Sequence, residues 1–201
     1  MPDLNFDPTD TDHVINIASW EVEHEDVLHL KNLYKLTHNW LMTHKFFSAD
    51  SYDQDDKIET LYFEKVTGSG AKEHHIWWRT HHVPEDSKYF KYYLKFDFQT
   101  LNTTKKETMY KGQKLKSNMS DVIMRCSAYL MIDYNKLWRN HSILKHFYKY
   151  FLLYIYKEQI EYYKTDLWLK AYKLQDVIKQ YLNLKTPEKM PEYFYDQATP
   201  P

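Results

Sequence analysis

The sequence predicts an α+β domain: an N-terminal helix, an antiparallel sheet of four to five strands, and a long C-terminal helical segment packed on the sheet. Three observations lead to this fold class. Apolar residues recur at three- and four-residue spacing over about residues 20–46, they alternate with polar residues between 57 and 134, and helical spacing returns after Asp133. Sequential strands with short links pair as a meander.

The N-terminal part of the chain divides into a lead-in and a helix. Residues 1–18 are acidic and contain Pro2 and Pro8, so we expect a flexible lead-in. Ser19 is a plausible N-cap for a helix over about 20–46. The acidic residues that follow it favour the positive end of a helix dipole; they are Glu21, Glu23, Glu25 and Asp26.

Strands are predicted at residues 57–66, 72–82, 88–101 and 121–134, and a small exposed hairpin at 106–116. The third strand alternates cleanly, with Tyr92, Leu94, Phe96 and Phe98 on one face. The last strand places another apolar set on one face, namely Val122, Met124, Cys126, Ala128, Leu130 and Ile132. We expect these apolar faces to pack under the helices.

Two apolar stripes predict the C-terminal helices. The first is Ile143, Phe147, Tyr150, Phe151 and Tyr154, and the second is Leu167, Ala171, Leu174, Ile178 and Leu182. We predict a bend near 162–165, because Thr165-Asp166 is a plausible cap for a second helix. Thr186-Pro187 ends the pattern, which leaves one domain over 19–185 and an extended, proline-containing tail over 186–201.

The run "IWWRTHHVPEDSKYFKYYLKFDFQTL" and the later "LQDVIKQYLNLK" resemble a family of uncharacterised proteins from small-genome archaea. The resemblance extends over most of the chain after about Leu28. The family carries no known activity, so the resemblance implies no function and no catalytic residues.

Composition excludes several classes of protein. Only three glycines occur, and none forms a phosphate-binding loop before a helix. The single cysteine, Cys126, cannot form an internal disulfide, which favours a reducing cytoplasm, and its apolar surroundings predict a packed side chain. No segment has the length and apolarity of a transmembrane helix.

The net charge of −1 hides an asymmetry along the chain. Residues 1–56 carry twelve acidic residues and three lysines, a net charge of −9, and the remainder carries +8. This asymmetry is typical of an acidic segment over a basic body, of a basic face for an anionic partner, or simply of two solvated faces.

The stretch "KEHHIWWRTHH", residues 72–82, contains four histidines but does not have metal-ligand spacing. Same-face histidines on this strand are six or eight residues apart, which corresponds to about 20 Å or more at roughly 3.3 Å per residue. Histidine pairs elsewhere miss the i, i+4 spacing of helical zinc motifs. No metal or cofactor is therefore predicted.

Catalytic motifs are equally weak. The chain has no Gly-x-Ser-x-Gly elbow, and Cys126 has no basic neighbour in the sequence. Asp97 and Asp133 are the remaining acid–base candidates, although carboxylates on strands usually face solvent. The sequence leaves enzyme activity undecided and favours a non-enzymatic role.

One sheet face has the composition of a recognition surface. If Ile76 and Trp78 point inward, the opposite face carries planar aromatics and basic groups, which protein interfaces and single-stranded nucleic acids both use. The predicted binding residues are His75, Trp77, Arg79, His81, Tyr93, Lys95, Arg125 and Tyr129. We expect a non-enzymatic binding or scaffold protein that contacts a protein partner or a second copy of itself.

Four alternatives remain. The C-terminal helix could cover this face and make its aromatics core, or the face could bind single-stranded nucleic acid. A small apolar ligand could occupy a cavity lined by Tyr92, Phe96, Phe98 and Phe151. Peripheral membrane attachment through residues 147–156 is the least favoured.

Overall fold

The computed structural model describes residues 6–10, 12–48, 57–110, 113–150 and 154–184. Strand β1 (Val14–Leu28) precedes helix α1 (Leu30–Thr43), which is followed by β2 (Phe47–Ser48), β3 (Glu59–Val66) and β4 (Lys72–His82). The long strands β5 (Phe90–Tyr110) and β6 (Gln113–Ile132) come next, and then α2 (Leu144–Tyr150) and α3 (Lys157–Tyr181). The predicted α+β class is confirmed at this level.

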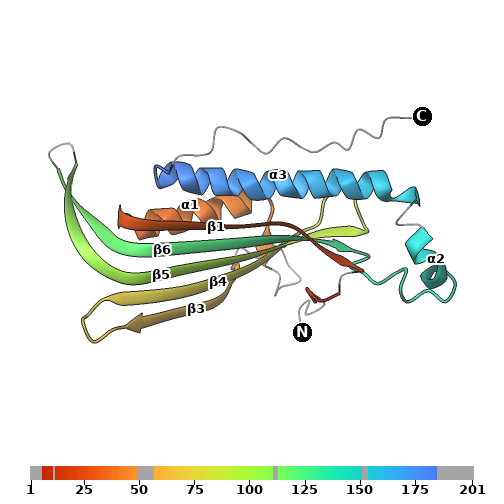
Figure 1. Ribbon diagram of the computed structural model, residues 1–201, viewed down its shortest axis with the longest axis horizontal. Helices are drawn as coiled ribbons and strands as arrows, with labels where there is room; N and C mark the ends of the chain where they lie inside the picture. The colour runs from red at the N-terminus through yellow and green to blue at the C-terminus, as the bar shows by residue number, and fades with distance from the viewer. Residues whose placement is uncertain (1–5, 11, 49–56, 111–112, 151–153, 185–201) are drawn as a thin grey trace, which may run out of the picture.

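The strands form one antiparallel sheet in the order β1-β6-β5-β4-β2, and β3 also pairs with β4. Strands β3 to β6 are the predicted meander. The first strand joins at β6, its neighbour in space and not in sequence, so six strands are present where four or five were predicted. The β5–β6 hairpin curls away from the rest of the sheet at one end (Figure 1).

The prediction of a helix beginning near residue 20 is wrong. Residues up to Leu28 belong to β1, and only Leu30–Thr43 is helical. Glu21, Glu23 and Glu25 alternate with apolar residues at the two-residue period of a strand, in which Trp20 and Val22 are buried. Acidic residues at this spacing are compatible both with a helix dipole and with a half-buried strand, and the pairing of β1 with β6 decides between them.

The predicted alternation of the central strands is confirmed. Strand β4 has the bounds expected of it, whereas β5 and β6 also include the predicted small hairpin and continue as a long ribbon. The predicted inward sets of β5 and β6 are all at most 3% exposed. They form the main hydrophobic core together with Ile76, Trp78 and residues of the two long helices.

Helix α3 lies along this apolar side of the sheet (Figure 1). Its predicted stripe is buried, and Leu167, Ala171, Leu174 and Ile178 are 0% exposed. Two hydrogen bonds attach α3 to the sheet. Trp20 Nε1 donates to the carbonyl of Ala171 at 3.0 Å, and the Tyr92 hydroxyl donates to Asp166 at 2.8 Å.

The C-terminal helical region divides earlier than predicted. Helix α3 passes through residues 162–165 without interruption, and Tyr163 in that stretch is buried against Phe90. The first apolar stripe is not core in the described residues: Ile143, Phe147, Tyr150 and Tyr154 are more than half exposed. No helix in the described part of the chain is long and apolar enough to cross a membrane.

The predicted lead-in contains ordered structure, because β1 begins at Val14 and Phe6 packs on the sheet. The predicted tail over 186–201 lies outside the described residues, as do Phe151 and the turn at Lys111-Gly112.

Replacement of Tyr92 by phenylalanine tests the attachment of α3. Burial, reinforced by Asp166, raises the pKa of the Tyr92 hydroxyl, which keeps the group protonated and donating. Loss of this charge-assisted hydrogen bond is expected to lower the free energy of unfolding by about 1.5–3 kcal/mol in urea titrations. Tyr162→Phe on the exposed side of α3 is the control, and equal stability of the two variants would contradict the assignment.

Candidate functional site

In the described residues one side of the sheet carries no helix, and all eight predicted binding residues lie on this side, here called the open face. Their positions alternate with the buried residues of β4, β5 and β6, and cross-strand pairs join Arg79 to Lys95, His81 to Tyr93, and Tyr93 to Tyr129. The side of the sheet that the helices cover is therefore the one bearing Ile76 and Trp78.

The tyrosine end of the open face is already occupied by the chain's own N-terminal segment. The ring of Phe6 stacks on Tyr93 with centroids 3.9 Å apart and meets the edge of Tyr129 at 5.0 Å. Tyr93 is only 9% exposed as a result. These two tyrosines belong to a small second core, which also contains Val14 and Met131.

The two arginines among the predicted binding residues are paired. Arg79 donates to Asp97 at 2.7 Å and lies 5.6 Å from the Trp77 ring centroid, and Arg125 forms an ion pair with Glu21. The hydrogen bond from Arg125 lowers the pKa of Glu21. Both guanidinium groups are neutralised by carboxylates of the same face, which weakens the case for phosphate contacts.

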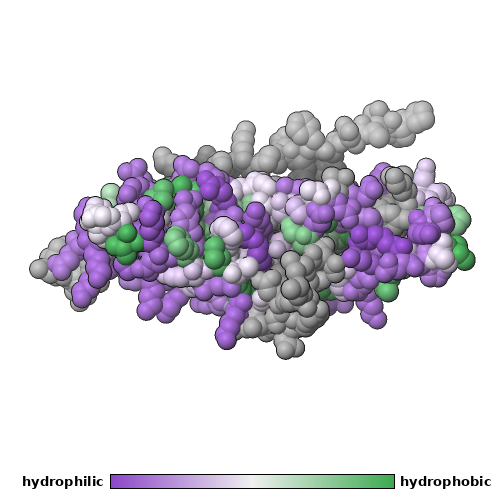
Figure 2. Space-filling model, turned by 90° about the horizontal axis from the view of Figure 1, so that it is seen from below, coloured by the Kyte–Doolittle hydropathy of each residue, from purple (hydrophilic) through white to green (hydrophobic). Residues whose placement is uncertain are grey.

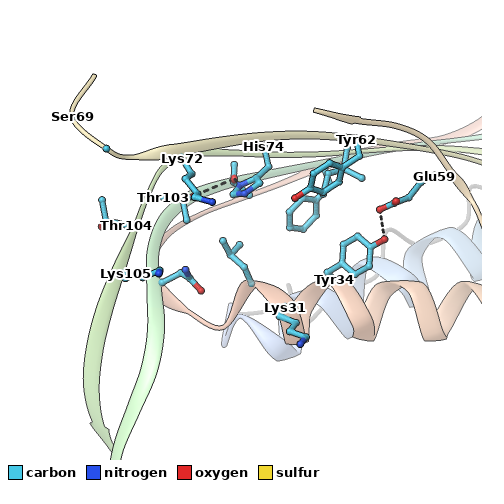
Figure 3. Close-up of a pocket in the computed structure, with 16 residues that line it drawn as sticks. Lys31, Tyr34, Glu59, Tyr62, Ser69, Lys72, His74, Thr103, Thr104 and Lys105 are labelled. Carbon is cyan, nitrogen blue, oxygen red and sulfur yellow. Dashed lines mark hydrogen bonds between the residues drawn. The ribbon is translucent and has the colours of Figure 1, made fainter. Parts of the chain in front are cut away.

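The opposite side of the sheet contains a pocket of about 850 Å³ between the first turn of α1 and the curled ends of β3 to β6. Figure 3 shows α1 on one side, with Tyr34 directed toward the strands, and Tyr62 and His74 on the other. The lining residues are Leu30, Lys31, Tyr34, Glu59, Tyr62, Ser69, Gly70, Lys72, His74, Ile76, Phe98, Thr100, Thr103, Thr104, Lys105 and Asn118.

The pocket has an uncharged floor and a charged rim. Ile76, Phe98, Thr100 and Thr103 line the floor and are at most 5% exposed. Every lysine and the single carboxylate of the lining belong to exposed residues. This segregation places apolar surface at depth and hydrated groups at the mouth.

A hydroxyl network closes the floor. The His74 Nδ1 atom lies 2.7 Å from the Thr100 hydroxyl oxygen, and the Thr103 hydroxyl bonds to those of Thr100 and Ser120 at 3.2 and 2.8 Å. Ser120 donates onward to the carbonyl of Leu101. Burial lowers the pKa of His74, which favours a neutral imidazole as a member of this network.

A β-bulge creates this arrangement. The register of β5 slips between Leu101 and Thr104 relative to β6, and Asn102 adopts a left-handed conformation with φ of 51°. The extra residue turns Thr103 inward beside Thr100, three positions earlier, and bends the ribbon. The polar network and the curl over the pocket therefore share one cause.

The Tyr34 side chain forms the aromatic wall. Its ring meets Trp78 edge-on at a centroid distance of 5.0 Å, and its hydroxyl donates to Glu59. Burial, and then this carboxylate, raises the pKa of Tyr34, so the phenol stays protonated. On the rim, Lys72 forms an ion pair with Glu64, which lowers the pKa of that carboxyl and raises the pKa of the lysine.

The other sequence candidates are not brought together. Cys126 is buried as expected, and desolvation raises the pKa of its thiol, which favours the protonated form. Asp97 pairs with the middle of β6, whereas Asp133 follows the end of that strand and accepts hydrogen bonds from the backbone of Trp138 and Arg139. Within the described ranges, no three His, Cys, Asp or Glu side chains are placed to hold a metal ion.

The sequence predicted an apolar cavity lined by four aromatic residues, and of these the structure places Phe98 at the pocket. Tyr92 and Phe96 are fully buried in the core, Phe151 lies outside the described residues, and only Phe98 reaches the pocket. A signal was nevertheless present. In "FDFQTLNTTKK" the strict alternation of β5 breaks at Asn102, as it does at a bulge.

Comparison with known proteins does not assign the chain to a family. No family model and no curated protein matches the sequence. Among solved structures, a "DELTA-ENDOTOXIN" matches with a TM-score of 0.32 and 11% identity, over 60% of this chain and 60% of that chain. A TM-score this low carries no argument about fold or function, and the resemblance to archaeal proteins stays a prediction.

Substitutions at Asn102 test the bulge. Valine at this position is expected to destabilise the protein by about 1–2 kcal/mol, because the left-handed conformation crowds a β-branched side chain against the backbone, whereas asparagine tolerates it. Glycine adopts this conformation freely, so Asn102→Gly should match the wild type in thermal unfolding. Equal stability of the valine and glycine variants would show that Asn102 does not hold the strained position.

Proposed function

We propose that the chain is a non-enzymatic binding protein that holds a small amphipathic molecule in the pocket between α1 and β3–β6. The observation that carries this proposal is the segregation of the lining into a buried, uncharged floor and an exposed, charged rim. An apolar segment of a ligand gains free energy when it leaves water for such a floor, while its polar end stays hydrated at the mouth.

Two further observations support this function. A volume of about 850 Å³ lies within the range of roughly 300–1,000 Å³ that is usual for small-molecule sites. The polar groups of the floor bond to one another, as the contacts among His74, Thr100 and Thr103 show. Side chains that are hydrogen-bonded to one another can fix the shape of a site, and they are poorly placed to act as a nucleophile or a base.

Chain length provides the first test. In displacement of the uncharged dye Nile red by primary alcohols, each added methylene should strengthen binding about three- to fourfold, from roughly 0.8 kcal/mol per buried CH₂, until the pocket is full. Leu30→Trp places an indole at the pocket wall and should abolish displaceable dye binding. Leu36→Trp, on the same helix outside the pocket, is the matched control.

Dye binding that survives Leu30→Trp, or that shows no dependence on chain length, would contradict a ligand in this pocket. Circular dichroism of both tryptophan variants establishes that each is folded before the comparison is made.

The predicted recognition role of the open face is a second proposal, with a second copy of the chain as the partner. Its observation is a patch at the edge of the sheet: Leu61, Phe63 and Trp77 are 36%, 50% and 44% exposed, and Leu61 pairs with Trp77 across the strands. Figure 2, seen from the side on which β3 lies in Figure 1, shows apolar side chains among a mainly hydrophilic surface.

The edge strand itself favours this partner. Within the described residues β3 pairs only with β4, and all eight of its residues are exposed. An unpaired strand edge is a template for another strand. Antiparallel pairing of two copies centred on Tyr62 would place Leu61 of each opposite Phe63 of the other.

Sedimentation equilibrium tests this association. The wild type is expected to dimerise with increasing concentration, and Leu61→Lys/Phe63→Lys to remain monomeric, because the paired strands would then bring like charges together. A wild type that stays monomeric throughout would refute self-association. Salt-sensitive binding of single-stranded RNA or DNA would favour the nucleic-acid alternative instead.

A further inference from the structure

The pocket is polar at one end and aromatic at the other. In Figure 3 Ser69, Lys72, Thr104 and Lys105 lie toward one end, and Tyr34 and Tyr62 lie toward the other. The aromatic end continues into the apolar floor. A ligand that fills this space must be amphipathic along its length, with its polar group beside the lysines.

The charges of the lining define the sign of that polar group. Three lysines line the pocket against one carboxylate, that of Glu59, which accepts a hydrogen bond from the Tyr34 hydroxyl. Lys72 is occupied by Glu64. Lys31 and Lys105 remain, and no described carboxylate pairs with either of them. The rim therefore has two ammonium groups that form no ion pair with a described carboxylate, one from α1 and one from β5, and the lining as a whole is net positive.

The backbone of α1 adds to the positive electrostatic potential at the pocket. The helix begins at Leu30, which lines the pocket, and has no acidic residue in its first turn. His29 at the N-cap makes no side-chain hydrogen bond to the helix. The positive end of the helix dipole is thus neither capped nor neutralised where it meets the pocket.

We propose that the ligand of this pocket is a linear amphipathic anion, a medium-chain carboxylate or a close analogue. Lys31 and Lys105 hold the anionic head, and the chain lies against Ile76 and Phe98. This inference rests on the proposed function and adds the chemical class of the ligand. In Figure 3 Lys31 lies on α1 near Tyr34, and Lys105 lies toward the other end of the pocket. The proposal therefore requires both lysine stems, each with four rotatable bonds, to turn toward a head group at the mouth, where it keeps part of its hydration.

Calorimetric titration of the full chain with dodecanoate, dodecanol and dodecyl trimethylammonium tests which charge the head group carries. Each ligand is kept below the concentration at which it forms micelles. Dodecanoate is expected to bind about tenfold more tightly than dodecanol, the size expected of two half-exposed ion pairs. The cation should bind more weakly than the alcohol. Added salt should reduce the preference for dodecanoate without affecting dodecanol.

The assignment to particular lysines has matched controls on the same elements. Lys31→Gln/Lys105→Gln should bind dodecanoate no more tightly than dodecanol while its affinity for dodecanol is unchanged. Lys35→Gln/Lys106→Gln removes two lysines from α1 and β5 that do not line the pocket, and should keep the wild-type preference.

The outcomes separate the two proposals. Failure of dodecanol, dodecanoate and Nile red to bind would overturn the proposed function itself. Binding of dodecanol and dodecanoate with equal affinity would leave that function standing and overturn the anionic ligand. A preference that survives Lys31→Gln/Lys105→Gln would overturn the head-group site.

An anionic head group joined to an apolar chain occurs both in free carboxylates in solution and in the lipids of a membrane. Sedimentation with phosphatidylglycerol vesicles, compared with phosphatidylcholine vesicles, distinguishes the sources. Binding of soluble dodecanoate without sedimentation identifies a free amphipathic anion as the ligand. Sedimentation with the anionic vesicles that Lys31→Gln/Lys105→Gln abolishes identifies a lipid as the source.

Discussion

The packing of α3 against one side of the sheet is the constraint on which the rest of the structure depends. Its stripe of fully buried residues, from Leu167 to Ile178, covers the apolar side of the sheet beside β1 and β6. Trp20 and Tyr92 fix this position by hydrogen bonds from two different strands. Helix α1 covers Trp78 with Leu33 and Tyr34 and begins where β1 ends. The strands continue past its first turn, and the pocket lies in the space that neither helix fills.

The alternation of side chains along the strands gives the two sides of the sheet different properties. On the open face, polar and aromatic groups are satisfied within the chain: Arg79 by Asp97, Arg125 by Glu21, and Tyr93 by Phe6. On the helix side, the bulge at Asn102 produces a polar network that is closed on itself and a rim whose lysines are only partly compensated. Uncompensated charge next to buried apolar surface is a stronger indication of a ligand than aromatic composition alone.

The sequence predicted local features well because they depend on neighbouring residues. The period-two pattern of residues 72–82 gives β4 its bounds, and the same pattern in β4, β5 and β6 places all eight predicted binding residues on one face. The helix expected from residue 20 failed because Glu21, Glu23 and Glu25 fit two periods, and the pairing of β1 with β6 that decides the matter joins distant parts of the chain. The lining of the pocket could not be predicted from the sequence for the same reason. The lining comes from α1 and four strands, and their approach depends on a single positive φ at Asn102.

The proposed function requires a ligand to bind on the helix side of the sheet, at the floor formed by Ile76 and Phe98. Backbone and methyl NMR shifts during titration with dodecanoate test this claim directly, because they locate the ligand whatever its affinity. Saturable shifts are expected at Leu30, Tyr34, Ile76, Phe98 and Thr103, with little change at Trp77 or Phe63. Shifts confined to the open face or to α2, with the floor residues unperturbed, would contradict it.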